Sequence, residues 1–244
     1  MIDELTILLN SFLEDDTDEG PQNVKFFLNW LRNFRQQSGS NIHWVFCSSV
    51  GIENFANLHG LNYTLNDVEP FPIGAFAPQK AKELFNALAQ SENLEFPSEL
   101  VDYTLEKISW HLPYFIQILF FNINQLITIY DHPISKETID DAYNNLIEDK
   151  HLNTWDERLK EYYLLEQNAR LLLTGLSKAK EGESRALLLS RLSSKITDTD
   201  KADLTLSRLL NMLKNDGYLD ITSEDKYVFR SPLLRDFWYN RFAR

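Results

Sequence analysis

Apolar residues follow three different patterns along the chain, and these patterns predict three successive regions. Short apolar runs and one helical stripe occupy residues 1–75, four helical stripes follow in residues 76–160, and residues 161–244 carry three more before two short strand-like segments. A buried strand is a short apolar run, whereas an amphipathic helix repeats every 3.6 residues. The patterns predict a mainly α protein with a partial α/β part, divided into domains at these boundaries.

The first region has the order strand, helix, strand. The run Trp44–Cys47 follows a turn-like segment and ends at Ser48 and Ser49, as a buried strand that leads into a loop would. The segment Val24–Phe34 has apolar residues at helical spacing. A second short strand is expected at Leu65–Val68, before Pro70. This alternation favours a small parallel sheet.

The second region reads as a compact set of helices. Helix starts are expected at Pro78, at Pro97–Glu99, at Pro113 and at Ser135–Thr138, because proline is favoured in the first turn and serine at the cap.

The third region predicts helices at Ala169–Leu176, Leu187–Leu192 and Leu204–Leu213. The turn Asn215–Gly217 and the strands Tyr218–Ile221 and Tyr227–Phe229 would follow as a hairpin, and an aromatic helix, Pro232–Phe242, would close the chain. Three helices followed by a hairpin is the order of a winged helix.

Composition and charge limit the function further. The 244 residues carry a net charge of −12 and a single cysteine, Cys47, and the five histidines show no metal-ligand spacing. The acidic balance disfavours nucleic acid and favours protein partners or self-association. Because the stretch Leu112–Ile129 is interrupted by polar residues and no signal peptide is recognisable, we expect a cytoplasmic protein that does not span a membrane.

Two groups of residues are candidates for chemistry. Asp3 and Glu4 would end the first buried strand, where one carboxylate can hold Mg²⁺ and its neighbour can orient or deprotonate a water; alternatively they are a solvated terminal pair. Ser48 and Ser49 end the Trp44 strand, where hydroxyl groups of an open parallel sheet can contact a phosphate. Alternatively these serines cap a turn.

The order of these segments resembles the rear portion of the AAA+ class of P-loop ATPases, near the STAND-type signalling ATPases. Asp3-Glu4 resembles the end of the Walker B strand, and the run from Trp44 to Ile52 resembles the sensor 1 strand and loop. The segment Leu112–Gln117 resembles the sensor 2 segment, although Trp110 or His111 stands near the position of its usual glycine. The last 30 residues resemble the winged-helix end of these ATPases.

This resemblance implies ATP and Mg²⁺ as cofactors of a complete protein. Asp3 would bind the metal, Glu4 would activate water, Ser49 would sense the γ-phosphate and Pro113 would line the base pocket. Residues 76–160 would form a helical lid. Such a protein acts as a nucleotide-dependent regulatory switch.

One feature departs from the resemblance. No Gly-x-x-x-x-Gly-Lys-[Ser/Thr] loop occurs in the sequence, and this loop supplies the backbone N–H groups and the lysine that hold the phosphates. We therefore expect a truncated parallel sheet, an exposed apolar edge on the Trp44 strand, and no ATP hydrolysis by this chain alone. Met1 would be an internal start or a truncation; alternatively the chain is a degenerate remnant that rearranged to hide the edge.

A second hypothesis is a non-enzymatic winged-helix module that binds protein or DNA. The third helix of the tail offers Arg208 and Lys214 but begins with Asp203, and the hairpin turn carries Glu224 and Asp225. This balance favours a protein partner over DNA.

Overall fold

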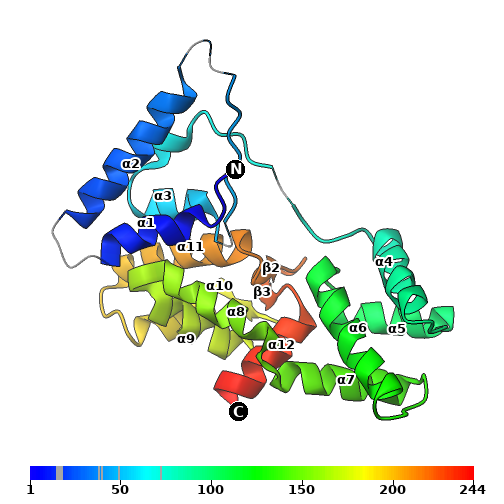
Figure 1. Cartoon of the computed structure of the whole chain (residues 1–244). Helices are drawn as coiled ribbons and strands as arrows, with labels where there is room; N and C mark the ends of the chain where they lie inside the picture. The colour runs from blue at the N-terminus through cyan, green and yellow to red at the C-terminus, as the bar shows by residue number, and fades with distance from the viewer. Residues whose placement is uncertain (15–18, 38, 40, 49, 72) are drawn as a thin grey trace.

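The chain is mostly helical, and helices within its first 65 residues lie against helices from the C-terminal part of the chain (Figure 1). The computed structural model describes residues 1–14, 19–37, 39, 41–48, 50–71 and 73–244. Within the described residues the named strands form one sheet, which is three-stranded and antiparallel. The mainly α class with a small β part is therefore confirmed.

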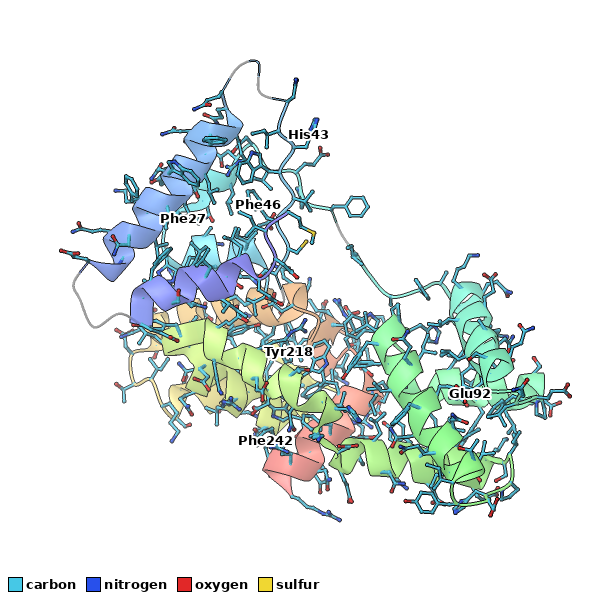
Figure 2. All side chains as sticks on the ribbon, viewed as in Figure 1. Phe27, His43, Phe46, Glu92, Tyr218 and Phe242 are labelled. Carbon is cyan, nitrogen blue, oxygen red and sulfur yellow. The ribbon has the colours of Figure 1, made fainter. Side chains whose placement is uncertain are left out.

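Residues 1–65, called here the N-terminal unit, wrap helices around one short parallel contact. The elements are α1 (Leu5–Glu14), α2 (Gly20–Arg35), α3 (Ile52–Leu58) and the 3₁₀ helix η1 (Asn62–Leu65). Ile2 forms an isolated parallel bridge with Phe46, so the chain leaves the first extended segment, crosses through α1 and α2, and returns parallel to it. Figure 2 shows Phe27 and Phe46 among the side chains of this unit. The core consists of Leu5, Leu9, Val24, Leu28, Leu31, Phe55, Ala56 and Leu61.

The strand expected at Leu65–Val68 is wrong, because Asn62–Leu65 forms a 3₁₀ turn instead. The spacing of Leu65 and Val68 suits a helical turn as well as a strand. Arg35 decides between them: its guanidinium donates 2.6 Å to the carbonyl of Thr64 and forms two hydrogen bonds, of 3.0 and 2.8 Å, with the carboxylate of Asp67. These contacts fix residues 64–67 in a turn.

The segment expected as the Trp44 strand is extended and presents an open edge. On one side, the N–H of Ile2 donates to the carbonyl of Val45, and the N–H of Cys47 donates to the carbonyl of Ile2, both at 2.9 Å. On the other side, the backbone groups of Trp44 and Phe46 have no backbone partner among the described residues. The parallel pairing is therefore limited to one bridge, and its outer edge is unpaired.

The four helices expected after residue 76 are all present. They are α4 (Pro78–Ser91), α5 (Ser98–Ile108), α6 (Pro113–Thr128) and α7 (Lys136–Glu148). Pro78 and Pro113 are first residues of their helices, where the missing N–H costs nothing. The Ser135 side chain accepts the N–H of Thr138 and caps α7. The helix-start residues thus predicted this segment well.

The last part of the chain contains the only named strands of the described residues. Its elements are η2 (Lys150–Leu152), α8 (Asn153–Glu157), η3 (Arg158–Leu165), α9 (Glu166–Leu176), β1 (Glu183–Ser184), α10 (Arg185–Ser193), α11 (Thr199–Asn215), β2 (Leu219–Ile221), β3 (Lys226–Phe229), α12 (Pro232–Trp238) and a π-helical turn η4 (Tyr239–Ala243). The strand order is β1-β3-β2, with Leu219 opposite Phe229. The three helices, the hairpin and the closing helix expected here are all found.

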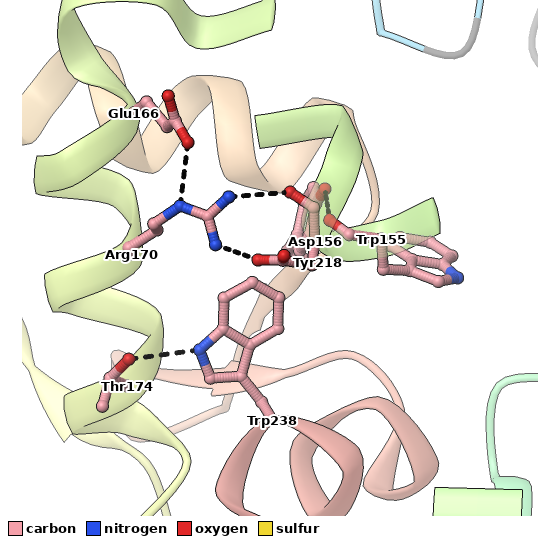
Figure 3. Close-up of polar contacts among 7 residues, drawn as sticks. All are labelled: Trp155, Asp156, Glu166, Arg170, Thr174, Tyr218 and Trp238. Carbon is pink, nitrogen blue, oxygen red and sulfur yellow. Dashed lines mark hydrogen bonds and ion pairs between the residues drawn. The ribbon is translucent and has the colours of Figure 1, made fainter. Parts of the chain in front are cut away.

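A buried polar cluster joins the helices of this C-terminal unit, defined as residues 153–243 (Figure 3). Arg170 on α9 contacts the Asp156 carboxylate and, at 3.0 Å, that of Glu166. The hydroxyl of Tyr218 donates 2.5 Å to the carbonyl of Trp155, and the indole N–H of Trp238 donates 3.3 Å to the Thr174 hydroxyl. These contacts tie α8, α9 and α12 to the residue that precedes β2.

The four-helix segment and the C-terminal unit share one hydrophobic core, which includes Ala81 in α4 and Trp238 in α12 and also takes in Val50 of the N-terminal unit. A hydrogen bond of 2.9 Å from the Tyr143 hydroxyl to Asp236 joins α7 to α12, and the Ser231 hydroxyl donates 3.0 Å to the carbonyl of Ile108. The division between residues 160 and 161 stays a prediction of the sequence.

Between the N-terminal unit and α4, residues 68–71 and 73–77 form no helix or strand (Figure 1). Phe71 and Ile73 on it are 86% and 89% exposed. Among the helices of the described residues, none is both long enough and apolar enough to cross a bilayer.

Gly217, at the turn between α11 and β2, is expected to be sensitive to substitution. Its φ is +86°, and a Cβ there would lie 2.7 Å from the Trp110 ring. Gly217→Ala should therefore lower the free energy of unfolding by about 1 to 3 kcal/mol. The matched control is Gly74→Ala, where a Cβ would meet nothing within 4 Å. Urea unfolding followed by circular dichroism measures both, and equal midpoints for the two variants would contradict the expectation.

Candidate functional site

The acidic pair lies at the end of the first extended segment, directly before α1. The bridge between Ile2 and Phe46 sets Asp3 and Glu4 beside the end of the Trp44 segment. Asp3 is exposed, and its Oδ1 accepts the N–H of Glu4 at 3.1 Å. Glu4 is half-buried and has a φ of +49°, a left-handed conformation that reverses the chain into the helix. The pair thus stands on a strand-to-helix turn, not on a helix.

Hydrogen bonds connect the loop that follows Cys47 to the C-terminal unit. We call residues 48–51 the serine loop; Ser49, the predicted γ-phosphate sensor, lies outside the described residues. The Thr6 hydroxyl, which is fully buried, donates 2.6 Å to the carboxylate of Glu161 on η3. Since that donation uses the only proton of the Thr6 hydroxyl, the Ser48 hydroxyl must donate to Thr6. The sequence of bonds therefore runs from Ser48 through Thr6 to Glu161.

A second connection joins the same loop to the C-terminal unit, at Asp216. Its Oδ1 accepts the N–H of Gly51 at 2.9 Å and the side-chain amide of Asn54 at 3.0 Å, and its Oδ2 accepts the hydroxyl of Tyr162 at 2.7 Å. Asp216 directly follows α11, so one carboxylate holds together the serine loop, α3, η3 and the turn before β2. This is the densest polar contact between the N-terminal and C-terminal units.

Burial sets the protonation of this group. Burial raises the pKa of Asp216, against the opposing effect of the Gly51 N–H, the Tyr162 hydroxyl and the nearby Arg158 charge. Burial, with the Asp216 charge beside it, also raises the pKa of Tyr162 well above its ordinary value. Tyr162 therefore remains a hydrogen-bond donor across the physiological range, and the Asp216 carboxylate carries a cost of ionisation in the folded state.

The segment before α6 reaches the same turn from the other side. The Trp110 indole packs over Gly217, and the Arg230 guanidinium lies 5.3 Å from its ring centre. The carbonyl of His111 accepts the N–H of Phe76 at 2.9 Å. Pro113 is half-buried as the first residue of α6. The segment that leads to Pro113 thus reaches the serine loop through Trp110, Gly217 and Asp216. Near the position where the sensor 2 segment usually has a glycine, this chain has the Trp110 ring, which packs against Gly217.

Sequence reasoning identified the acidic pair and the loop but missed their partners. Thr6, Glu161, Tyr162 and Asp216 gave no local signal, because each acts through a contact that joins distant parts of the chain. Asp216 was interpreted only as part of a tight turn. The one usable hint is that a carboxylate preceding a left-handed glycine often stands where backbone and side-chain donors can converge.

The described residues supply carboxylates but no phosphate cradle. The carboxylates of Asp3 and Glu4 are of the type that binds Mg²⁺ together with phosphate oxygens and water. No group of three or more His, Cys, Asp or Glu side chains in the described part of the chain could hold a metal by itself. The sequence contains no Gly-x-x-x-x-Gly-Lys-[Ser/Thr] loop, the segment that holds the phosphates in P-loop proteins.

Comparison with solved structures identifies a similar fold. The Walker-type ATPase of Pyrococcus abyssi matches with a TM-score of 0.56 and 14% sequence identity, over 97% of this chain. The match covers 61% of that ATPase, so this chain spans about three fifths of its length. No protein-family model and no curated protein matches the sequence. The chain therefore shares its fold with part of a P-loop ATPase.

Asp216 offers a test of the connection between the two units. Asp216→Ala removes the acceptor of three donors and should lower the free energy of unfolding by about 2 to 4 kcal/mol. Asp216→Asn keeps an acceptor for Gly51 and can donate to the Tyr162 oxygen, so it should cost far less. Urea unfolding measures both variants. An equal decrease in the free energy of unfolding would show that the hydrogen bonds of Asp216 do not account for its contribution to stability.

The stability difference between Asp216→Asn and the unsubstituted protein is expected to depend on pH. Since the folded pKa of Asp216 is raised, the folded state binds its proton more tightly than the unfolded state. Its contribution is therefore fully present below the ordinary pKa of an aspartate and is lost as pH rises through the folded pKa. The stability of Asp216→Asn relative to the unsubstituted protein should increase over that window, and a constant difference from pH 4 to pH 7 would contradict the assignment.

Proposed function

We propose that this chain provides the acidic-strand, lid and C-terminal parts of a nucleotide-dependent regulatory switch of the STAND-like, AAA+ type. It would work with a phosphate-binding segment that residues 1–244 do not contain. The fold shared with part of a Walker-type ATPase supports this proposal. In the switch, Asp3 is proposed to bind Mg²⁺, Glu4 to orient water, and Ser49 and Pro113 to contact the nucleotide.

The observation that carries the proposal is the double connection of the serine loop. Ser48 reaches η3 through Thr6 and Glu161, and Gly51 reaches the C-terminal unit through Asp216. A displacement of the loop by even one or two ångströms would break both sets of bonds, since hydrogen bonds weaken steeply beyond their normal length. The loop position and the attachment of the C-terminal unit are therefore coupled, as a switch requires.

A second candidate is a non-enzymatic winged-helix module, and the order α9, β1, α10, α11 and the β2–β3 hairpin supports it. For this role a protein partner is favoured over DNA. The outer face of α11, the helix that would enter a DNA groove, lines a cavity against α3. In the hairpin turn, Lys226 is paired with Glu224 at 2.7 Å. A duplex would meet a helix face that carries a single arginine, Arg208, and a wing whose lysine is already paired.

Nucleotide calorimetry tests the switch. Residues 1–244 are expected to give no heat of binding with Mg-ATP and no hydrolysis, because nothing in them cradles phosphate. The reading frame extended upstream of the Met1 codon should encode a Gly-x-x-x-x-Gly-Lys-[Ser/Thr] loop. The protein made from that longer frame should bind Mg-ATP. In that product Asp3→Asn should weaken binding about tenfold, a loss of roughly 1.4 kcal/mol.

The matched control for that series is Asp102→Asn, which removes a half-buried carboxylate on α5 that pairs with Lys82 at 2.5 Å. Turnover by residues 1–244 after rigorous purification would contradict the proposal. An upstream frame that encodes no phosphate-binding loop would contradict it as well.

Duplex binding separates the two candidates. We expect fluorescence anisotropy with a labelled random duplex to show no salt-dependent binding, since the net charge is −12 and the wing lysine is paired with Glu224. A DNA-binding module would instead lose affinity steeply between about 50 and 200 mM salt. That result would favour the winged-helix DNA module over the switch.

A further inference from the structure

A cavity of about 360 Å³ lies between the N-terminal and C-terminal units. One wall is α3, with Asn54, Asn57 and Leu58, and the other is the outer face of α11, with Leu204, Arg208 and Asn211. Figure 1 shows α3 and α11 lying side by side. The cavity is separate from the acidic pair and from Pro113, and the proposed switch assigns it no role.

Arg208 gives the cavity a positive charge without an internal counter-charge. Its guanidinium forms no ion pair, hydrogen bond or ring contact with the described residues, and no acidic side chain lines the cavity. The nearby acid on the same helix, Asp203, is bound to Arg185 at 2.7 Å. An available arginine in a chain of net charge −12 points to an anionic ligand group.

The other polar groups of the lining are uncharged, and two of its amides, Asn57 and Asn211, have unused hydrogen-bonding groups. Asn211 has no hydrogen-bond partner among the described residues, and Asn57 uses only its oxygen, which accepts from Asn62 at 3.0 Å. Amide side chains offer the same donor and acceptor pair as a peptide group. Beside them, Leu58, Leu204 and Met212 form an apolar surface. The lining is therefore suited to a peptide with one aliphatic side chain.

The charge of the ligand group is limited to about one. A phosphate is held by several N–H donors or by a helix N-terminus, and neither is available here. Arg208 is the single charged side chain that lines the cavity. A ligand with one carboxylate matches that charge.

We propose that this cavity binds a short extended peptide of a partner protein, with a carboxylate on Arg208 and an aliphatic side chain on the leucines. The carboxylate can be an acidic side chain or a chain terminus. This site does not depend on the proposed nucleotide switch. Because its two walls belong to different units, an occupant would hold α3 and α11 together.

Side-chain amide resonances of the ¹⁵N-labelled full chain report occupancy directly. The probes are acetyl-Ala-Leu-Asp-amide and acetyl-Ala-Ala-Leu with a free carboxyl end, which separate the two carboxylate sources. The controls are acetyl-Ala-Leu-Asn-amide and acetyl-Ala-Leu-Lys-amide. At least one carboxylate probe should shift the Asn57 and Asn211 resonances saturably, with an affinity about tenfold above that of both controls, as expected for a charge-assisted hydrogen bond.

Arg208→Met should remove that preference, whereas Lys201→Met, an exposed cation on α11 outside the cavity, should leave it unchanged. Asn211→Ala should weaken all probes alike, because it removes an amide and no charge. Absence of saturable shifts with both carboxylate probes, equal binding of the lysine control, or full affinity in Arg208→Met would each overturn the proposal. Nucleotide binding plays no part in the readout, so failure here is distinguishable from failure of the switch.

Discussion

The arrangement of this protein depends on one buried carboxylate. Asp216 receives three hydrogen bonds, from the backbone of Gly51 and the side chains of Asn54 and Tyr162. Burying a charge is unfavourable unless donors surround it, and the three donors come from three different elements. The hydrogen bonds therefore fix the position of each of these elements relative to the carboxylate. Removal of any one donor would raise the cost of burying the charge and loosen the attachment of the other two.

A second constraint comes from the shared core behind this carboxylate. The four-helix segment and the C-terminal unit bury their apolar faces together, so they behave as one packed body. The N-terminal unit has a smaller core of its own. It meets that body through polar contacts around Thr6, Gly51 and Asp216, and also through Val50 and Leu58, which pack into the shared core. The joint between the two parts therefore combines hydrogen bonds with a small apolar contact.

Local signals in the sequence predicted most of the fold. Pro78, Pro113 and Ser135 marked helix starts because their effects act within one turn, and the turn ending at Gly217 marked the hairpin through its left-handed backbone. The strand at Leu65–Val68 was wrong because Arg35, some thirty residues away, decides that conformation. Helix α1 was not anticipated.

The candidate site was less predictable than the fold. The acidic pair and the serine loop could be located, but Thr6, Glu161, Tyr162 and Asp216 become partners only when distant segments meet. No pattern of periodicity or capping contains that information. The roles proposed for Asp3, Glu4, Ser49 and Pro113 stay predictions.

The exposed segment between the N-terminal unit and α4 has a consequence for the energetics of the joint. A tether of about ten residues keeps two attached surfaces at an effective concentration in the millimolar range. Surfaces held in this way remain together even when their intrinsic affinity is weak. A few hydrogen bonds and a small apolar contact are then sufficient for association, and the two surfaces would stay near each other even if these contacts were broken.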